Sequence, residues 1–355
     1  VYKRQVQGSG MLLGLLIGQW VDGRGLRRCM IGGLILLTLA SAMGAATAGW
    51  SQWTIWGLMM TRLVEGVGFL LTVLPGPALL RRTLAADRLT PFLGYWGTYM
   101  PTGMSLALLL GPLWLQHADW PSWWWCFSLA SAVMAWAMQR WIEPDPLPGP
   151  MGVGSGMWTR VRSTLQAKGP WIIALMFGVY SAQWLAVVGF LPSIYAAAGV
   201  QGAALAVLTT TASAANIMGN IMSGQLLGRG WSERATLLTG YVAMALGSWL
   251  AFDLRTEHWP VLRFAGILLF SALGGLIPGT LFTLAVRLAP GPHLVGSTVG
   301  WMQQISAAGQ FIGPPLAAAL AMAVGGWQMT WCFTLLCGLG GIALTALAWP
   351  RLKRQ

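Results

Sequence analysis

Long apolar runs separated by short polar connections make up almost the whole chain. A helix needs about 20 residues to cross roughly 30 Å of hydrocarbon, and eleven runs approach or exceed that length. They lie near residues 7–21, 29–48, 53–80, 91–115, 121–142, 170–195, 201–227, 235–252, 259–286, 294–320 and 327–349. The runs are continuously apolar, without the alternation of a membrane β-barrel. The pattern therefore predicts an all-α protein with about eleven transmembrane helices.

The longest polar connection divides these runs into two groups. It begins with the sequence EPDPLPGP at 143–150, which cannot continue a helix because of its prolines. Arg160 and Arg162 then follow in a short amphipathic piece. We therefore predict an N-terminal bundle over 1–142, a cytoplasmic linker over 143–169 and a C-terminal six-helix bundle over 170–355.

The two groups carry related sequences about 205 positions apart. GQWVDGRG at 18–25 returns as GQLLGRG at 224–230, and WCFSL at 125–129 returns as WCFTL at 331–335. Such a repeat indicates a duplicated half. In this register the run 170–195 has no counterpart in the first half. We therefore expect two pseudo-symmetric helical bundles on a twelve-helix plan, with the first helix missing.

Charge agrees with a membrane protein and suggests its orientation. Only 8% of residues are charged, against about a quarter in an ordinary soluble domain. Basic residues gather in alternate connections and at the C-terminus, and such loops lie on the cytoplasmic side. This predicts a multi-pass protein of the cell inner (cytoplasmic) membrane with a cytoplasmic C-terminus. Lys3 and Arg4 depart from the rule, since they fall on the opposite side.

Several other classes of function do not fit the sequence. The net charge of +12 is dispersed over the ends of apolar runs, whereas a nucleic-acid surface gathers its basic residues on one face. There is no phosphate-binding loop, and the four cysteines form no Cys-x-x-Cys pair. The three histidines lie at the ends of runs and do not cluster. We expect no enzyme, no metal, no cofactor and no nucleic-acid partner.

The turn after the first run carries a recognisable motif: Gly18, Asp22, Gly25, Arg27 and Arg28 stand at the spacing Gly, Asp, then Gly followed by basic residues. The chain thereby resembles the major facilitator superfamily (MFS) of secondary transporters. RLVEGVG at 62–68 and GTYMPTG at 97–103 are most similar to its cyanate and nitroimidazole permease-like branch. Two departures are Gly23, where a basic residue is usual, and Leu26.

The resemblance implies a secondary active transporter in which two six-helix bundles alternate access to a site between them. Its partners would be a small-molecule solute, membrane lipid and, as a candidate coupling ion, the proton; a monomer is expected. The resemblance also implies a conformational gate that joins the two halves on the cytoplasmic side when the cavity faces outward. Its residues would be Gly18, Asp22, Arg24, Gly25, Arg27 and Arg28.

Charged residues inside the apolar runs are candidates for function because an ion in hydrocarbon is costly. Arg62 lies near the middle of its run, and Glu65 shares its helix face. The pair is either a permanent ion pair or a site at which Arg62 binds an anion and Glu65 exchanges a proton. Arg263 is the rough counterpart in the second half. It either completes an anion site or reaches out to the membrane surface.

Uncharged polar residues inside the runs could line a central cavity or form hydrogen bonds between helices. They are Tyr99, Tyr180, Gln183, Asn216, Asn220, Gln303, Gln304 and Gln310. A further set of residues permits bends or close helix contacts, either for rocking of the halves or for packing alone. This set is Gly103, Gly111, Pro112, Gly309, Gly313 and Pro314.

The function that we expect from the sequence is transport of a small solute, an anion or weak acid, with proton coupling through Glu65. Two alternatives share the fold. One is an exporter of drugs or metabolites, which would have a larger and more apolar cavity. The other is a sensor that binds a solute without transporting it.

Overall fold

The structure is a computed structural model that describes residues 5–49, 54–146 and 156–352, and these residues are almost entirely helical, with no strand among them. The helices are α1 (Gln5–Arg24), α2 (Leu26–Ala46), α3 (Thr54–Val73), α4 (Gly76–Thr83), α5 (Ala86–Trp96), α6 (Tyr99–His117), α7 (Trp120–Trp141), α8 (Met157–Gln166), α9 (Lys168–Val188), α10 (Leu191–Ala197), α11 (Gly202–Gly228), α12 (Glu233–Phe252), α13 (Pro260–Gly274), α14 (Leu276–Leu288), α15 (Val295–Val324) and α16 (Thr330–Leu352). Short 3₁₀ turns are η2 (Thr47–Gly49), η4 (Leu254–Thr256), η5 (Pro292–Leu294) and η6 (Trp327–Met329).

The predicted all-α membrane fold is confirmed, and each predicted run coincides with one helix or with two consecutive helices. Eight segments of the described chain are long and apolar enough to cross a membrane. The remaining three runs correspond to α1, α5 with α6, and α7. The expected helix ahead of residue 1 and the basic residues Lys3 and Arg4 lie outside the described residues.

Four of the runs predicted as single spans are broken helices, which corrects the sequence analysis. The breaks separate α3 from α4, α5 from α6, α9 from α10, and α13 from α14. Each second segment has a proline within its first three residues: Pro77, Pro101, Pro192 and Pro278. Proline has no N–H to continue the preceding helix but fits the first turn of a new one.

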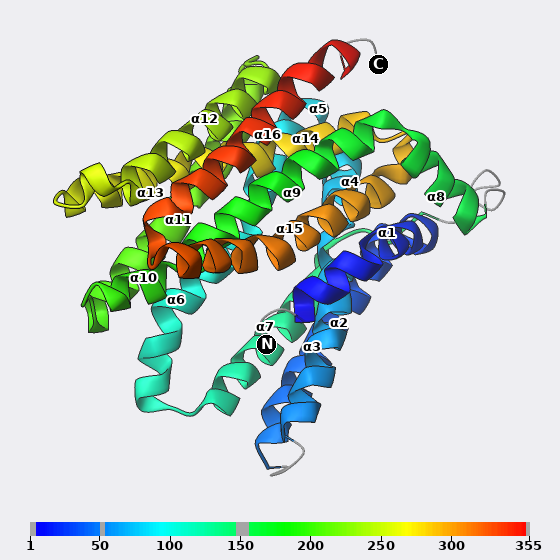
Figure 1. Cartoon of the computed structure of the whole chain (residues 1–355). Helices are drawn as coiled ribbons and strands as arrows, with labels where there is room; N and C mark the ends of the chain where they lie inside the picture. Colours follow the sequence, from blue (N-terminus) through cyan, green and yellow to red (C-terminus); the bar gives the residue numbers. More distant parts are fainter. Residues whose placement is uncertain (1–4, 50–53, 147–155, 353–355) are drawn as a thin grey trace.

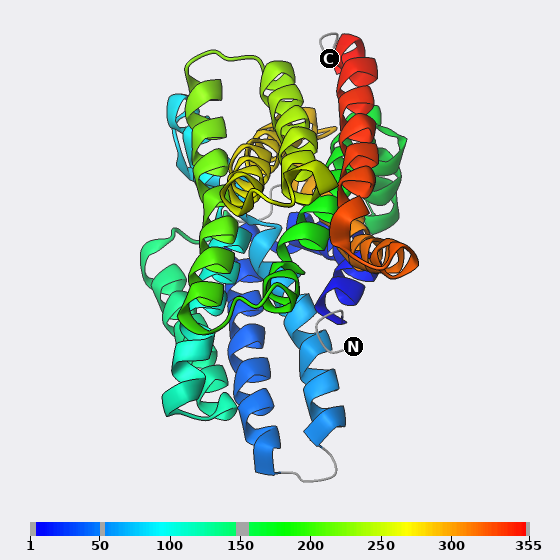
Figure 2. The same cartoon turned by 60° about the vertical axis from the view of Figure 1, so that its left-hand side comes forward.

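The helices form two halves: Figure 2 shows α2, α3, α6 and α7 at the bottom, and α12, α13 and α16 at the top. In the N-terminal half α2 packs on α3 and α7, and in the C-terminal half α12 packs on α13 and α16. In the sequence repeat α2, α3 and α7 correspond to α12, α13 and α16, so the two halves pack in the same way. The halves meet in two places, where α1 packs on α15 and where α5 and α6 pack on α11. This is the predicted pair of pseudo-symmetric bundles.

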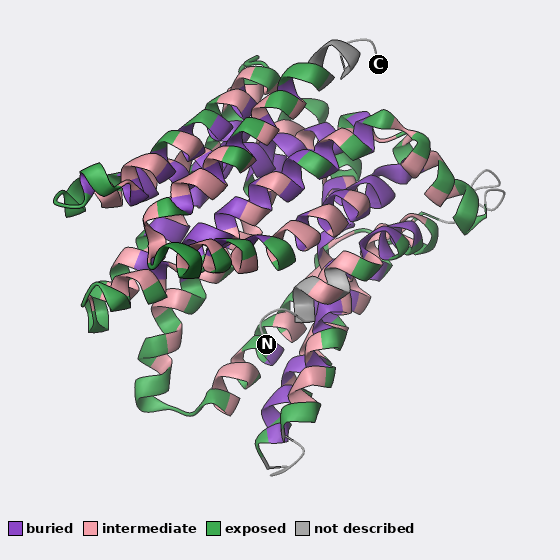
Figure 3. Ribbon diagram, in the orientation of Figure 1, coloured by how far each residue is buried: buried purple, intermediate pink, exposed green. Residues whose placement is uncertain are grey.

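Buried side chains concentrate in the C-terminal half, where α9, α13, α14 and α15 meet (Figure 3). Tyr241, Phe270 and Phe282 are its largest fully buried side chains. The Tyr241 hydroxyl donates a hydrogen bond of 2.8 Å to the carbonyl of Met176, which satisfies the one polar atom of this ring. The C-terminal half thus provides a rigid wall for the site described below.

The basic connections meet at one end of the molecule, which we call the basic end. It includes the turn at Gly25, the start of α5, the linker helix α8 and the starts of α12 and α15. At this end α8 packs against α1, α9 and α15, and therefore touches both halves. Figure 1 shows α8 there, on the same side of the molecule as the C-terminus.

Candidate functional site

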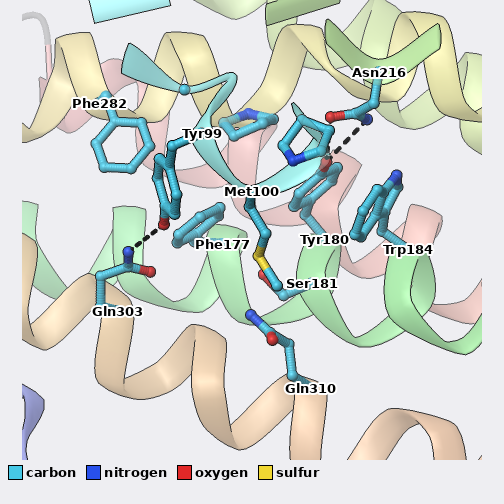
Figure 4. Close-up of a pocket in the computed structure, with 13 residues that line it drawn as sticks. Tyr99, Met100, Phe177, Tyr180, Ser181, Trp184, Asn216, Phe282, Gln303 and Gln310 are labelled. Atoms are coloured by element: carbon cyan, nitrogen blue, oxygen red, sulfur yellow. Dashed lines mark hydrogen bonds between the residues drawn. The ribbon is translucent and has the colours of Figure 1, made fainter. Parts of the chain in front are cut away.

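A small cavity lies between the halves, beside the break that separates α5 from α6 (Figure 4). The N-terminal half contributes residues from this break, and the C-terminal half contributes residues from α9, α11, α14 and α15. The lining consists of Gly97, Tyr99, Met100, Pro101, Phe177, Tyr180, Ser181, Trp184, Asn216, Pro278, Phe282, Gln303 and Gln310. The free space inside is about 30 Å³, room for one or two water molecules.

Tyr99 joins the two halves at this cavity. Its hydroxyl accepts a hydrogen bond of 2.6 Å from Nε2 of Gln303 on α15. The ring of Tyr99 packs against Phe282 of α14, with ring centroids 6.4 Å apart, and against Phe69 of α3 and Trp96 of α5. One side chain therefore contacts both halves through its ring and its hydroxyl.

A second set of hydrogen-bonded side chains comes from the C-terminal half alone. The Tyr180 hydroxyl donates to Oδ1 of Asn216 at 3.2 Å, and Nδ2 of Asn216 donates to the Ser271 carbonyl at 2.8 Å. Asn220, one turn along α11, donates to Oδ1 of Asn216 at 3.0 Å but does not line the cavity. This network fixes the orientation of the Asn216 amide at the wall.

The opposite wall carries a hydroxyl and an amide. Ser181 and Ser306 are hydrogen-bonded through their hydroxyls at 2.7 Å, and Nε2 of Gln310 donates to the Ser306 hydroxyl at 3.2 Å. These groups connect α9 to α15 next to the cavity. The lining thus offers hydrogen-bond donors and acceptors on more than one side.

Aromatic and sulfur-containing side chains fill the rest of the lining, and the sequence analysis missed them. Phe177 stacks on Tyr180, with an interplanar angle of 5° and centroids 6.0 Å apart, and Trp184 and Met100 complete the surface. Apolar residues are the norm inside membrane-spanning helices, so no signal in the sequence separates these from packing residues. The Trp184 indole N–H has no hydrogen-bond partner among the described residues, which leaves a free donor.

Of the predicted binding residues, the structure brings Tyr99, Tyr180, Asn216, Gln303 and Gln310 together around the cavity. The others lie elsewhere. Gln304 accepts a hydrogen bond of 2.8 Å from the backbone N–H of Leu15, which is a contact between α15 and α1. Gln183 is fully buried, and neither of its amide atoms has a partner among the described residues.

Arg62 and Glu65 form an ion pair within the N-terminal half and do not line the cavity. The Arg62 guanidinium lies 3.9 Å from the centroid of the Trp124 ring on α7, and Glu65 interacts with Ser41 of α2. Both charges are thus compensated by α2, α3 and α7. Of the two alternatives that the sequence left open, this geometry corresponds to the permanent ion pair.

Arg263 reaches the end of its helix opposite the basic end. Its Nη2 donates to the Asp253 carbonyl at 3.0 Å, and its Nε contacts the Thr256 hydroxyl at 3.4 Å. Both acceptors lie in the connection between α12 and α13. The side chain takes the course expected for an arginine that extends toward the membrane surface, and it is not near Arg62 in a common cavity.

Asp22 joins the halves at the basic end. Its carboxylate accepts hydrogen bonds from the backbone N–H groups of Gly296 at 2.9 Å and Ser297 at 2.7 Å, and from the Ser297 hydroxyl. These N–H groups lie in the first turn of α15, where the helix has free donors and a positive dipole end. The carboxylate therefore caps a helix of the other half and joins the two halves at the basic end.

Glycines let the backbones of α1 and α15 touch next to this cap. An added Cβ at Gly14 would lie 2.6 Å from the Gly300 carbonyl oxygen, and one at Gly18 would lie 2.5 Å from that of Gly296. Both pairs have the four-residue spacing with which small residues line one helix face. At the basic end the two halves thus meet through a direct backbone contact between α1 and α15, with one carboxylate at its end.

The other predicted gate residues act within the N-terminal half and its linker. Asp145 accepts hydrogen bonds from the backbone N–H groups of Arg27 at 3.1 Å and Arg28 at 2.9 Å, and it pairs with Arg82 at 2.6 Å. Gly25 has φ 107°, and a Cβ there would meet the Asp145 carboxylate. Arg24 stacks over Trp20 at 5.3 Å instead of approaching the other half.

Partial burial opposes ionisation of Asp145, but the two N–H donors and Arg82 outweigh it and hold its pKa below the ordinary value. The carboxylate therefore stays ionised and links the start of α2, the end of α4 and the linker.

The predicted bend and packing residues differ in what they touch. Cβ atoms at Gly309 and Gly313 would collide with the backbone of α9, so these glycines permit close contact of α15 with α9. At Gly103 and Gly111 no atom lies within 4 Å of an added Cβ. Pro112 and Pro314 lie inside α6 and α15, where each removes one helical hydrogen bond.

Comparison with known proteins gives a consistent result. A family model described as Major Facilitator Superfamily matches residues 8–307. The chain is 25% identical over 300 residues to the cyanate transport protein CynX of Escherichia coli, a match that covers 81% of this chain and 72% of that protein. This similarity agrees with the predicted resemblance to the cyanate permease-like branch.

Solved structures of transporters share the fold. The proton:xylose symporter XylE has a TM-score of 0.80 at 10% identity, covering 98% of this chain and 84% of that chain. The E. coli fucose:proton symporter FucP has a TM-score of 0.75 at 14% identity, covering 98% and 89%. The human organic anion transporter MFSD10 has a TM-score of 0.71 at 15% identity, covering 99% and 82%. The shared fold agrees with the family model, which matches most of the chain and shows that it belongs to the Major Facilitator Superfamily, a family of membrane-embedded secondary transporters rather than enzymes.

Proposed function

We propose that this transporter carries a small solute without net charge, or a weak acid in its protonated form, by alternating access between the two bundles. The observation that carries the proposal is the lining of the cavity: none of its 13 described residues is Arg, Lys, Asp, Glu or His. Moving an ion out of water costs several kcal/mol unless an opposite charge compensates it. A neutral solute avoids this cost and can use the amides and hydroxyls instead.

The size of the cavity favours a small solute over a drug. Sites for drug-sized ligands enclose about 300–1,000 Å³. The free volume of about 30 Å³ is far below that range. The aromatic walls and the donors and acceptors of Tyr99, Gln303 and Gln310 suit a compact polar molecule.

The names of the relatives include both charged and uncharged solutes. Cyanate, named for the E. coli relative, is the anion of a weak acid, and xylose and fucose, named for two structural neighbours, are uncharged. The organic anion transporter supports the charged alternative. That alternative would need a compensating cation, but Arg62 is paired with Glu65 and Arg263 binds a backbone carbonyl. Proton coupling through Glu65 stays a prediction.

Counterflow in proteoliposomes tests the proposal. Vesicles preloaded with unlabelled solute are diluted into labelled solute, using cyanate, short monocarboxylates, small polyols and a permanently charged sulfonate. Protein-free vesicles measure the passive passage of protonated acids. We expect protein-dependent exchange of a polyol, or of an acid at a rate that follows its protonated fraction.

Exchange of the sulfonate at a comparable rate would contradict the charge argument. Binding without exchange of any solute would favour the sensor alternative. A Gln303→Ala variant serves as a control because it removes an amide from the cavity wall, and exchange that is unchanged in this variant would place the solute elsewhere.

A further inference from the structure

The linker helix α8 approaches the gate with one basic side chain. Nε of Arg160 donates a hydrogen bond of 3.2 Å to Oε1 of Gln19, which is fully buried on α1. Arg160 is also close enough to interact electrostatically with the Asp22 carboxylate. Asp22 is the residue that caps α15, so Arg160 stands next to the contact between the halves.

Gly23 provides the space for this arrangement. A Cβ at Gly23 would lie 2.9 Å from Nη2 of Arg160, so the guanidinium lies directly on the backbone of α1. Gly23 is also the position at which the gate sequence departs from the family pattern by lacking a basic residue. A cation from a different element occupies the space that a side chain at this position would take.

The orientation of α8 is specific. Arg160 and Thr164 lie one turn apart and face the bundles, and Thr164 is fully buried. Arg162 and Trp158 are exposed. The helix also packs on α9 and α15, so it is attached to both halves where they close.

We propose that Arg160 is a positioning residue of the gate: its guanidinium supplies, from the linker, the positive charge that keeps the Asp22 carboxylate in place on α15. The carboxylate shares a pocket with Arg81, Arg82 and His293, but the groups that donate hydrogen bonds to it, on Gly296 and Ser297, are all neutral, and the cation whose charge acts on it is Arg160. Without the cation the buried carboxylate is less well compensated, and the closed gate loses stability relative to the open one. The inference rests on alternating access in the proposed function.

The test measures the distance between the two halves at the basic end in the absence of solute. Spin labels are attached to Arg140→Cys on α7 and Arg234→Cys on α12, both exposed at the basic end, in a background lacking the four native cysteines. Pulsed electron resonance in nanodiscs then reports the distance between the halves. In Arg160→Gln we expect the ratio of open to closed molecules to rise about tenfold, which corresponds to about 1.4 kcal/mol.

Three further variants make the result specific. Arg162→Gln removes the same charge from the exposed face of α8 and should leave the distances unchanged. Arg160→Lys keeps the charge and should stay largely closed. Arg160→Gln combined with Gly23→Arg returns a cation to the neighbourhood of Asp22 from α1 itself, and it should restore the closed population. Thermal unfolding of each variant checks that the protein is folded.

Equal distances in Arg160→Gln and Arg162→Gln would overturn the proposal. So would opening that the Gly23→Arg change fails to reverse, because the effect would then not come from the charge. Neither result bears on counterflow, so transport by the chain is tested separately.

Discussion

The hydroxyl of Tyr99 and the side-chain amide of Gln303 meet at 2.6 Å across the boundary between the two bundles, inside the cavity proposed to bind solute. A solute that binds there competes for these two groups. The bond therefore connects occupancy of the site with contact between the halves.

Tyr99→Phe should weaken solute binding while leaving the fold intact. The ring keeps its contacts with Phe69, Trp96 and Phe282, but the solute loses the hydroxyl as a hydrogen-bonding group. One hydrogen bond contributes about 0.5–1.5 kcal/mol, so we expect the apparent affinity to fall by up to about tenfold. Concentration-dependent counterflow measures it. Tyr95→Phe, at an exposed ring on α5, is the matched control, and equal kinetics in the two variants would contradict the role of the hydroxyl.

Gly14→Ala should disturb the gate, and Gly111→Ala should not. The added methyl at Gly14 would lie 2.6 Å from the carbonyl oxygen of Gly300, whereas the methyl at Gly111 meets nothing within 4 Å. Overpacking costs about 1–3 kcal/mol, while alanine in an uncrowded helix gains up to about 1 kcal/mol. Melting temperatures and the spin-label distance at the basic end distinguish the two. A tolerated Gly14→Ala would mean that α1 and α15 do not touch through their backbones.

Asp145→Asn should remove a pH-dependent part of the stability. The pKa of Asp145 is lower in the folded protein than in the unfolded chain, so its contribution is fully present above the unfolded pKa of about 3.9. The contribution decreases as the pH falls through the folded pKa. Melting curves from pH 3 to 7 should therefore show the largest difference between the two proteins near neutral pH and a smaller one in acid. A constant difference would show that the charge is not responsible.

Arg62→Gln distinguishes the two interpretations of the charged pair. The ion-pair geometry predicts lower stability with unchanged solute preference. The variant removes the positive charge beside Glu65 and leaves this carboxylate with Ser41 as a neutral hydrogen-bond partner. The effect should be smaller than the 3–5 kcal/mol of a fully buried pair, since Arg62 is 24% exposed. Adding Glu65→Gln should recover part of the loss. Abolished uptake with an unchanged melting temperature would return Arg62 to the binding site.

The helices could be predicted from the sequence because periodicity and length suffice to identify a membrane span. The breaks within four spans could not, although Pro77, Pro101, Pro192 and Pro278 mark where the helices begin again. A proline in a span has several possible consequences, and only the surrounding helices decide which occurs.

Part of the cavity lining could be predicted from the sequence. Tyr99, Tyr180, Asn216 and Gln303 were found because polar groups are rare at membrane depth. The same reasoning gave equal weight to Arg62, but its side chain packs against Trp124 of α7 and pairs with Glu65, and it does not face the cavity. Sequence defines the faces of a helix but not the neighbour of each face. The contribution of Arg160 to the gate depends on how the linker folds back, which no local pattern encodes.

A lining without charged side chains also has a consequence for the electrical character of the proposed transport. A step that carries one elementary charge across the membrane gains or loses about 2.3 kcal/mol per 100 mV of membrane potential. The uncharged walls around Tyr180 and Gln310 contribute no such charge. A protonated acid takes its own proton with it, so its passage is electroneutral, and a voltage imposed with an ionophore should leave its rate unchanged.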